Sequence, residues 1–318
     1  MPTWSEIKNE IYQFVPSPRE PGFDEVRRDY LKKLSAHTKR NTILYASGWV
    51  QKPDISGAYI ILNDDDTQGF MEVQKEIVGD QLDLILHSPG GDPMVAESIV
   101  MYLRSRYTHI RVIVPHLAMS VATMIACAAD EIIMGGHSAL GPIDPQFVLT
   151  TNTGTRLVAA RDILDQYNEL KAAFEDRNDP RQMMAIIDLY APDLLNKAHK
   201  AIQDSINLTE EWLLRNMKLQ EPVARETAAW LAANPRVRSH GRHIMRDRLQ
   251  AKGVPVTALE KDPKMQDLVL SVFHAATIAF SEAYSTKIIE NHHGRAFIKN
   301  QPQPIMPHIR QPQFLPPQ

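Results

Sequence analysis

Residues 82–93 read LDLILHSPGGDP, and this stretch decides the fold. The apolar run over residues 82–87 predicts a short buried strand, and the Ser-Pro-Gly-Gly segment after it predicts a turn. Residues 93–106 then place their apolar side chains on one side of a helix. The sequence therefore predicts a strand, a turn and a helix in direct succession.

A second unit of the same kind follows. Residues 111–115 predict a strand, residues 116–120 a tight connection, and residues 121–129 a helix built from small residues. A further strand is predicted at residues 131–134. Because strands and helices alternate, we expect an α/β fold whose strands pair in parallel through right-handed crossover helices.

The outer parts of the chain have a different texture. On the amino-terminal side, residues 42–50 and 58–62 predict two more strands, and the aspartates at 64–66 favour capping of a helix through residue 77 over metal binding. Two polar helical patterns precede them, at residues 4–14 and 23–37. The carboxyl-terminal half is mainly helical, with helices predicted at residues 160–174, 181–189, 193–207, 210–217, 222–234 and 247–252.

These patterns divide the chain into three parts. We expect an N-terminal helical arm over residues 1–40 and an α/β domain over residues 41–290. A proline-rich tail over residues 291–318 has no periodicity and is expected to be extended or disordered.

Composition excludes several classes of protein. The net charge of -3 disfavours nucleic-acid binding, and the one cysteine, Cys127, excludes an intramolecular disulfide. The N-terminus lacks a basic stretch followed by an apolar one, so it does not indicate a signal peptide. The most apolar stretch, residues 112–134, is interrupted by charged residues and proline and predicts buried core. We therefore expect a cytoplasmic protein without a membrane-spanning segment.

Two turns contain the candidate catalytic groups. Ser120 lies where a strand turns into a helix, so its hydroxyl can project from the strand end beside the backbone N–H of Val121. A serine there is, taken alone, more often a helix cap. Gly90 and Gly91 lie at the neighbouring strand end, where they let the backbone approach a substrate and expose N–H groups to an oxyanion. The two turns together favour acyl transfer.

Four blocks of sequence in this region resemble the serine dehydrogenase proteinase family, a distant relative of Clp proteases and signal peptide peptidase A. The resemblance is dense over residues 82–147 and recurs faintly near residue 240. The blocks are LILHSPGG at 84–91, VPHLAMS at 114–120, AADEIIM at 128–134 and LGPIDPQ at 140–146. The resemblance implies a Clp/crotonase-type fold for residues 41–290 and a serine peptidase that forms homo-oligomers.

The resemblance also implies a triad in the order Ser, Asp, His. Ser120 takes the position of the nucleophile, Asp144 that of the orienting carboxylate and His240 that of the base. His243 and His199 remain alternatives for the base. Signal peptide peptidases use a lysine instead, and Lys171 lies at a similar distance after the serine, in an ordinary polar helix.

Three functions compete at this stage. The first is a peptidase that forms an acyl-enzyme on Ser120, needs no metal or organic cofactor, and acts on a peptide or protein. The second is a crotonase-like acyl-CoA enzyme, which the Ser120 block does not favour. The third is a Clp-like oligomeric scaffold or peptide-binding protein without turnover, because Val121 and Ala122 stand where the family usually has glycines directly after the serine. The sequence does not identify an unfoldase partner.

Overall fold

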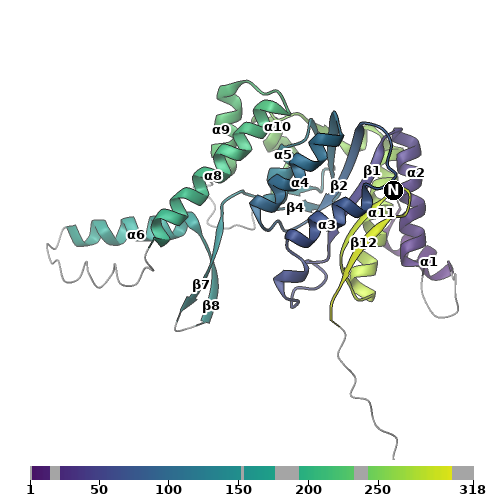
Figure 1. Cartoon of the computed structure of the whole chain (residues 1–318), viewed down its shortest axis with the longest axis horizontal. Helices are drawn as coiled ribbons and strands as arrows, with labels where there is room; N and C mark the ends of the chain where they lie inside the picture. Colours follow the sequence, from purple (N-terminus) through teal and green to yellow (C-terminus); the bar gives the residue numbers. More distant parts are fainter. Residues whose placement is uncertain (1, 15–21, 152–153, 176–192, 233–242, 303–318) are drawn as a thin grey trace, which may run out of the picture.

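A seven-stranded sheet forms the centre of the molecule (Figure 1). The computed structural model describes residues 2–14, 22–151, 154–175, 193–232 and 243–302. The strands lie in the order β10-β5-β3-β2-β1-β11-β12. They span Asn41–Ser47 (β1), Gln81–His87 (β2), His109–Val114 (β3), Glu131–Met134 (β5), Val256–Ala258 (β10), Ser285–Asn291 (β11) and Ala296–Asn300 (β12).

Five of these strands are parallel, as the alternation of strands and helices predicted. β1, β2, β3, β5 and β10 pair in parallel, whereas β11 and β12 extend the sheet in antiparallel fashion beyond β1. In a parallel sheet the carboxyl ends of the strands meet at one edge, where α/β proteins bind ligands. Ser88 directly follows β2, and Ser120 lies on the connection that leaves β3 at this edge.

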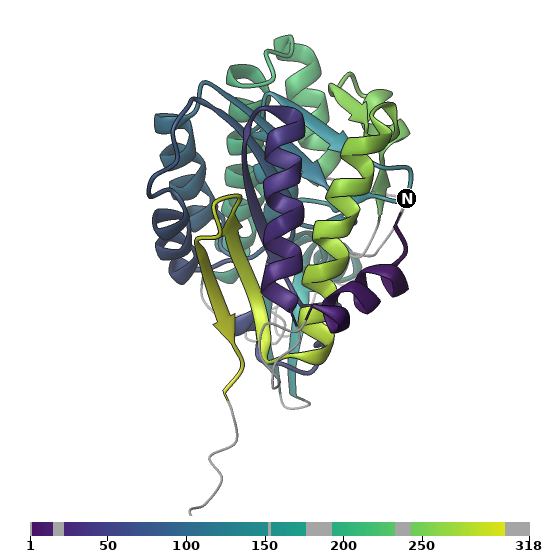
Figure 2. The same ribbon diagram turned by 90° about the vertical axis from the view of Figure 1, so that its right-hand side faces the viewer.

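Helices cover both faces of the sheet. One face carries α3 (Asp64–Val73), α4 (Pro93–Arg106) and α5 (Val121–Cys127), and the other carries α2 (Phe23–Thr38) and α11 (Pro263–Glu282) (Figure 2). Side chains of β2 alternate accordingly, with Leu84 and Leu86 in the first core and Ile85 in the second. The short helix α1 (Trp4–Gln13) packs outside α2 and α11.

Several elements extend the molecule to one side of this sheet (Figure 1). They are the hairpin β7 (Gln146–Thr151) and β8 (Gly154–Ala159), and the helices α6 (Ala160–Glu175) and α8 (Leu194–Arg215). The helices α9 (Glu221–Ala232) and α10 (Arg246–Gln250) bury residues in the main core. Helix α8 joins the two regions. Ala198 and Ile202 pack with Ile163 of α6, and Trp212 and Leu213 belong to the main core.

A second, three-stranded sheet lies at the carboxyl edge. Its strands β4 (Leu117–Ala118), β6 (Ala139–Leu140) and β9 (Ile244–Met245) lie in the order β4-β6-β9. β4 and β6 pair in parallel, and β6 and β9 are antiparallel. This sheet brings together the segments before Ser120, before Asp144 and after His243.

Some predicted elements differ from the observed ones. Residues 58–62 form no strand, because β1 already has β2 and β11 on its two sides; Gly57–Tyr59 is a short 3-10 helix instead. The two helices predicted at 193–207 and 210–217 are one helix, α8. The hairpin, α11 and β11 were not predicted as such. The helix predicted at 181–189 lies outside the described residues.

The predicted arm and tail also need correction where the structure describes them. Leu31 and Leu34 of α2 are fully buried against Leu44 of β1, so this helix is a layer of the fold. Residues 296–300, expected to be extended or disordered, are extended and pair with β11 as the edge strand β12. The apolar run of β11 supplies the partner that the local sequence of the tail lacks.

The long apolar stretch at residues 112–134 is buried, as predicted. It supplies β3, α5 and β5, and every residue of α5 is buried. Within the described parts of the chain, no helix has the length and apolar character needed to cross a membrane.

Candidate active site

Ser120 occupies a strained turn between β4 and α5. Its backbone has φ 53° and ψ -121°, a conformation that residues other than glycine rarely adopt. Such residues cost about 1–3 kcal/mol each and cluster at functional sites. The side chain is half-buried, and its hydroxyl makes no capping hydrogen bond to α5. The alternative of a simple helix cap therefore does not account for this serine.

The Gly90-Gly91 turn lies directly against Ser120. A methyl group built on Gly90 would be 2.7 Å from the Met119 carbonyl oxygen, 2.8 Å from the Val121 nitrogen and 2.9 Å from Ser120 Cβ. Gly90 has φ 93°, which a side chain would also strain. Only glycine allows the two turns to approach this closely.

Backbone hydrogen bonds hold the two turns in register. The Ser88 amide donates to Leu117 O at 3.2 Å, and the Met119 amide donates to Ser88 O at 2.9 Å. Ser88 and Ala118 thus form a parallel bridge that joins the ends of β2 and β4. The predicted convergence of the two strand ends is confirmed.

Two backbone amides at these turns remain available as hydrogen-bond donors to a bound substrate. The Gly90 amide donates to Ser88 Oγ at 3.1 Å. Within the described residues, neither the Gly91 amide nor the Val121 amide has a hydrogen-bond acceptor. An oxyanion needs donors of this kind.

Asp144 lies on a segment that is fixed beside the serine turn. The Gly141 amide donates to Ala118 O at 3.0 Å, and the buried Thr123 hydroxyl lies 2.9 Å from Ala118 O and 2.8 Å from Gly141 O. Asp144, three residues further on, is half-buried and accepts a hydrogen bond from Gln146 Nε2 at 3.1 Å.

His240 lies outside the described residues, but the chain on both sides of it is well placed. On one side, Leu231 O of α9 accepts from the Ile143 amide at 3.1 Å. On the other, Ile244 of β9 pairs with Leu140. The described residues on the two sides of this segment therefore contact residues that precede Asp144 closely in sequence.

The alternative bases have different surroundings. His243 is exposed and directly precedes β9. The pKa of His116 is lowered mainly by burial, then by the charge of His137, and then by the charge of His243. His199 and Lys171 lie on exposed faces of α8 and α6. Figure 1 shows α6 extending away from the sheet. His243 is therefore the alternative with a described link to the serine segment.

An aromatic cluster that the sequence only partly indicated lies beside the same edge. His87 is fully buried, and its ring stacks on His116 and Trp49 and meets the edge of Phe273. Burial, followed by the charge of His116, lowers the pKa of His87 to about 3, so this ring is neutral. No local pattern in the sequence connects Trp49 and Phe273 with this site, because α11 brings Phe273 from far along the chain.

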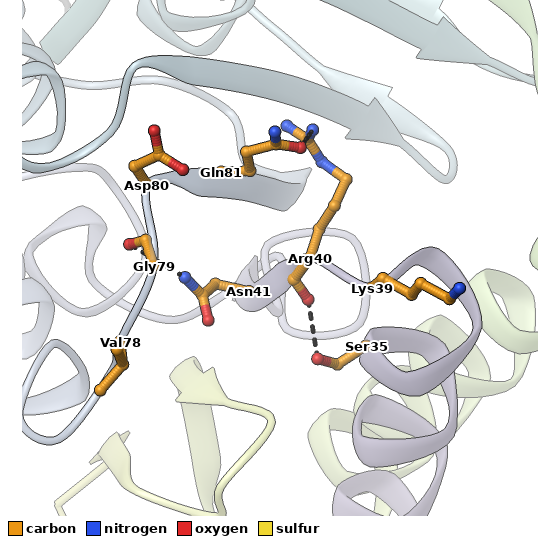
Figure 3. A pocket seen from close by; sticks show the side chains of 8 residues that line it. All are labelled: Ser35, Lys39, Arg40, Asn41, Val78, Gly79, Asp80 and Gln81. Carbon is orange, nitrogen blue, oxygen red and sulfur yellow. Dashed lines mark hydrogen bonds between the residues drawn. The ribbon is translucent and has the colours of Figure 1, made fainter.

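A polar cleft lies at the opposite edge of the sheet (Figure 3). Arg40 lies beside it, and its side chain is already bound, donating to Asp83 Oδ1 at 2.6 Å and to the carbonyl oxygens of Leu82 and His109. These bonds explain the polar lining as a structural connection between the starts of β1, β2 and β3.

Other nucleophiles and metal ligands do not form a competing site in the described residues. Burial raises the pKa of the Cys127 thiol to about 12, which makes it unreactive. No group of three or more histidine, cysteine, aspartate or glutamate side chains is arranged to hold a metal ion in those parts of the chain.

The fold and this turn define the class of the protein: a Clp-like α/β protein with a serine at the carboxyl edge of its parallel sheet. Residues 57–261, more than half of the chain, match the family of ClpP-like SDH-type serine proteinases. The chain belongs to this family, as the resemblance predicted.

Two curated relatives share a shorter segment. The chain is 52% identical over 65 residues to the uncharacterized protein MJ0137 of Methanocaldococcus jannaschii, and 48% identical over 65 residues to MJ1495 of the same organism. The matched segment covers 20% of this chain and 23% and 22% of those two proteins.

Proposed function

We propose that this protein is a serine peptidase in which Ser120 attacks the carbonyl carbon of a peptide bond and forms an acyl-enzyme. The observation that carries the proposal is the strained Ser120 turn in direct contact with Gly90. Ser120 is held in a rare backbone conformation, and its hydroxyl and the two amides have no hydrogen-bond partner among the described residues. The turn therefore offers the nucleophile and the oxyanion donors that acyl transfer requires.

The amides of Gly91 and Val121 stabilise the oxyanion in this mechanism. Because the Gly90 amide already donates to Ser88 Oγ, Gly91 is the better candidate of the two glycines. The Val121 side chain is 5% exposed and packs in the main core. It therefore points away from the serine turn into the protein, which supports a competent site despite the missing glycine.

His240 serves as the base and Asp144 orients it. The resemblance supports these roles, and so do the contacts of Leu231 with Ile143 and of Ile244 with Leu140, which lie on the two sides of the segment that contains His240. His240 takes the proton from Ser120 as the C–O bond forms and gives it to the leaving amine. Water then hydrolyses the acyl-enzyme by the same route.

Labelling with a fluorophosphonate probe tests the nucleophile. We expect the wild-type protein and Ser98→Ala, which changes an exposed serine of α4, to be labelled equally, and Ser120→Ala to remain unlabelled. An unlabelled wild type with retained peptide affinity would favour the scaffold alternative. Equal labelling of Ser120→Ala would refute the assignment of the nucleophile.

The same assay identifies the base. His240→Ala is expected to lower the labelling rate by about 10²–10⁴-fold, the usual contribution of a general base. His243→Ala, His199→Ala and Lys171→Ala serve as matched variants, and we expect each to stay within about threefold of wild type. A larger loss in one of these three would move the role of the base to that residue.

Self-association is part of the proposal, because Clp-like proteins form closed oligomers. Light scattering at micromolar concentration is expected to give the mass of an oligomer. A mass of 36.0 kDa, that of one chain, would contradict it.

A further inference from the structure

A lysine and an aspartate form an ion pair inside the protein, far apart in sequence and outside the catalytic groups. Lys287 of β11 donates to both carboxylate oxygens of Asp66 at 2.7 Å and to Ile61 O at 2.7 Å. Both side chains have no exposed surface. A buried pair of this kind is poor evidence for stability, since apolar residues of similar volume often stabilise a fold as well or better.

The ion pair fixes the start of α3. Asp66 Oδ2 accepts from the Asn63 amide at 3.0 Å and from the Tyr45 hydroxyl at 3.0 Å. Lys287 holds Ile61 O at the same time. The segment at 61–66 is therefore held from both ends by one charged pair.

This segment in turn holds the glycine turn. The Leu62 amide donates to Gly90 O at 2.8 Å, and the Asp92 amide donates to Leu62 O at 3.0 Å. A methyl group built on Gly91 would lie 2.2 Å from Leu62 O, so the two backbones are in direct contact. Any movement of Leu62 moves Gly91.

Tyr45 completes the contacts of Asp66. Its hydroxyl donates to Asp66 Oδ2 at 3.0 Å, and burial, followed by the charge and hydrogen bond of Asp66, raises the pKa of Tyr45 well above its ordinary value. The phenol therefore stays protonated and donates to the carboxylate that fixes the start of α3.

We propose that the buried Lys287–Asp66 pair, with Tyr45, positions the Gly90-Gly91 turn so that the Gly91 amide points at the oxyanion. These three are positioning residues: they act through the segment at 61–66 and its Leu62, and do not contact the substrate. The inference rests on the proposed function, because it gives a role to the turn that serves as oxyanion hole. It explains why a charged pair, and not an apolar one, is buried at this place.

Two variants test the proposal. Tyr45→Phe removes the phenol oxygen and keeps the ion pair, and the double variant Lys287→Met with Asp66→Asn removes both charges without leaving one unpaired. Lys299→Met is the matched control, since Lys299 of β12 pairs with the neighbouring Asp65 at 2.5 Å and, among the described residues, has no hydrogen bond to the turn. Circular dichroism and thermal unfolding show that each variant is folded.

Three measurements are made on each variant. The rate of fluorophosphonate labelling is expected to fall about 10-fold in Tyr45→Phe and about 100-fold in the double variant, and to stay within twofold in Lys299→Met, because a misplaced donor costs rate and not binding. With a fluorogenic peptide, kcat falls and KM is unchanged. Amide hydrogen exchange in a peptide covering residues 88–92 rises at least 10-fold, while exchange in α4 is unchanged.

Hydrogen exchange separates this inference from the proposed function. If no protein is labelled, including wild type, the proposed peptidase is wrong, and faster exchange at 88–92 still supports the positioning of the turn. If exchange and labelling in both variants equal those of Lys299→Met, the positioning role is refuted while Ser120 keeps its role.

Discussion

Replacing Gly90 by alanine tests the contact on which the site depends. The added methyl group would meet three atoms of the serine turn at 2.7–2.9 Å: Met119 O, the Val121 nitrogen and Ser120 Cβ. All three belong to the backbone or to its first side-chain atom, so no flexible side chain can move aside. The backbone at φ 93° adds about 1–2 kcal/mol of strain. Overpacking adds about 1–3 kcal/mol, so we expect Gly90→Ala to lower the free energy of unfolding by about 2–5 kcal/mol.

Gly294 provides a matched control. Its φ is 86°, close to that of Gly90, but the nearest atom to an added methyl group is Arg28 Cδ at 3.4 Å, in a flexible side chain. Gly294→Ala therefore introduces the backbone strain without the steric contact, and we expect a loss of about 1–2 kcal/mol.

Urea unfolding measures both variants, and fluorophosphonate labelling reports the site. We expect Gly90→Ala to label at least 100-fold more slowly than wild type, because the turn must move away from Ser120. Gly294→Ala is expected to label normally. Equal free energies of unfolding for the two variants, together with normal labelling of Gly90→Ala, would refute the close approach of the two turns.

Two further predictions concern buried charged and titratable groups. The pKa of His87 is about 3 in the folded protein against an ordinary 6.5, so the unfolded chain binds more protons between these values and stability falls as pH falls through this range. Between pH 7 and pH 5 the His87 site lowers the free energy of unfolding by about 2 kcal/mol. In urea unfolding, His87→Asn should therefore lose about 2 kcal/mol less than wild type over this pH range. An equal loss in both proteins would contradict the buried neutral ring. Arg27→Ala leaves the fully buried Glu290 with one remaining arginine and is expected to cost about 3–5 kcal/mol. Lys33→Ala, which removes an exposed pair within α2, should cost under about 1 kcal/mol, and similar losses in both variants would argue against the buried pair.

Local patterns predicted the central elements well. The helix at 93–106 and the strand at 131–134 agree with α4 and β5 to the residue, and the strand at 82–87 agrees with β2 within one residue. The strand pattern and the amphipathic pattern are both read within about ten residues, so these elements need no knowledge of distant partners. Their alternation was enough to predict the parallel sheet.

Elements that depend on distant partners were harder. The hairpin at 146–159 leaves Val148 and Leu157 exposed and so lacks a clear buried face. Strand β12 has too little apolar character to be recognised alone and gains its place by pairing with β11. Helix α11 is different: Asp262 caps it and Pro263 begins it, so its start carries a local signal in the sequence.

By itself, the sequence determined the α/β class and the proximity of Ser120 to the Gly90-Gly91 turn, because consecutive parallel strands must end at the same edge. Only the tertiary structure decided that Ser120 adopts a strained backbone, that Gly90 touches it, and that Val121 faces the core. It alone paired Lys287 with Asp66 across 221 residues. The reason is that burial and charge pairing depend on which distant segments meet, and periodicity within one segment carries no information about its partner.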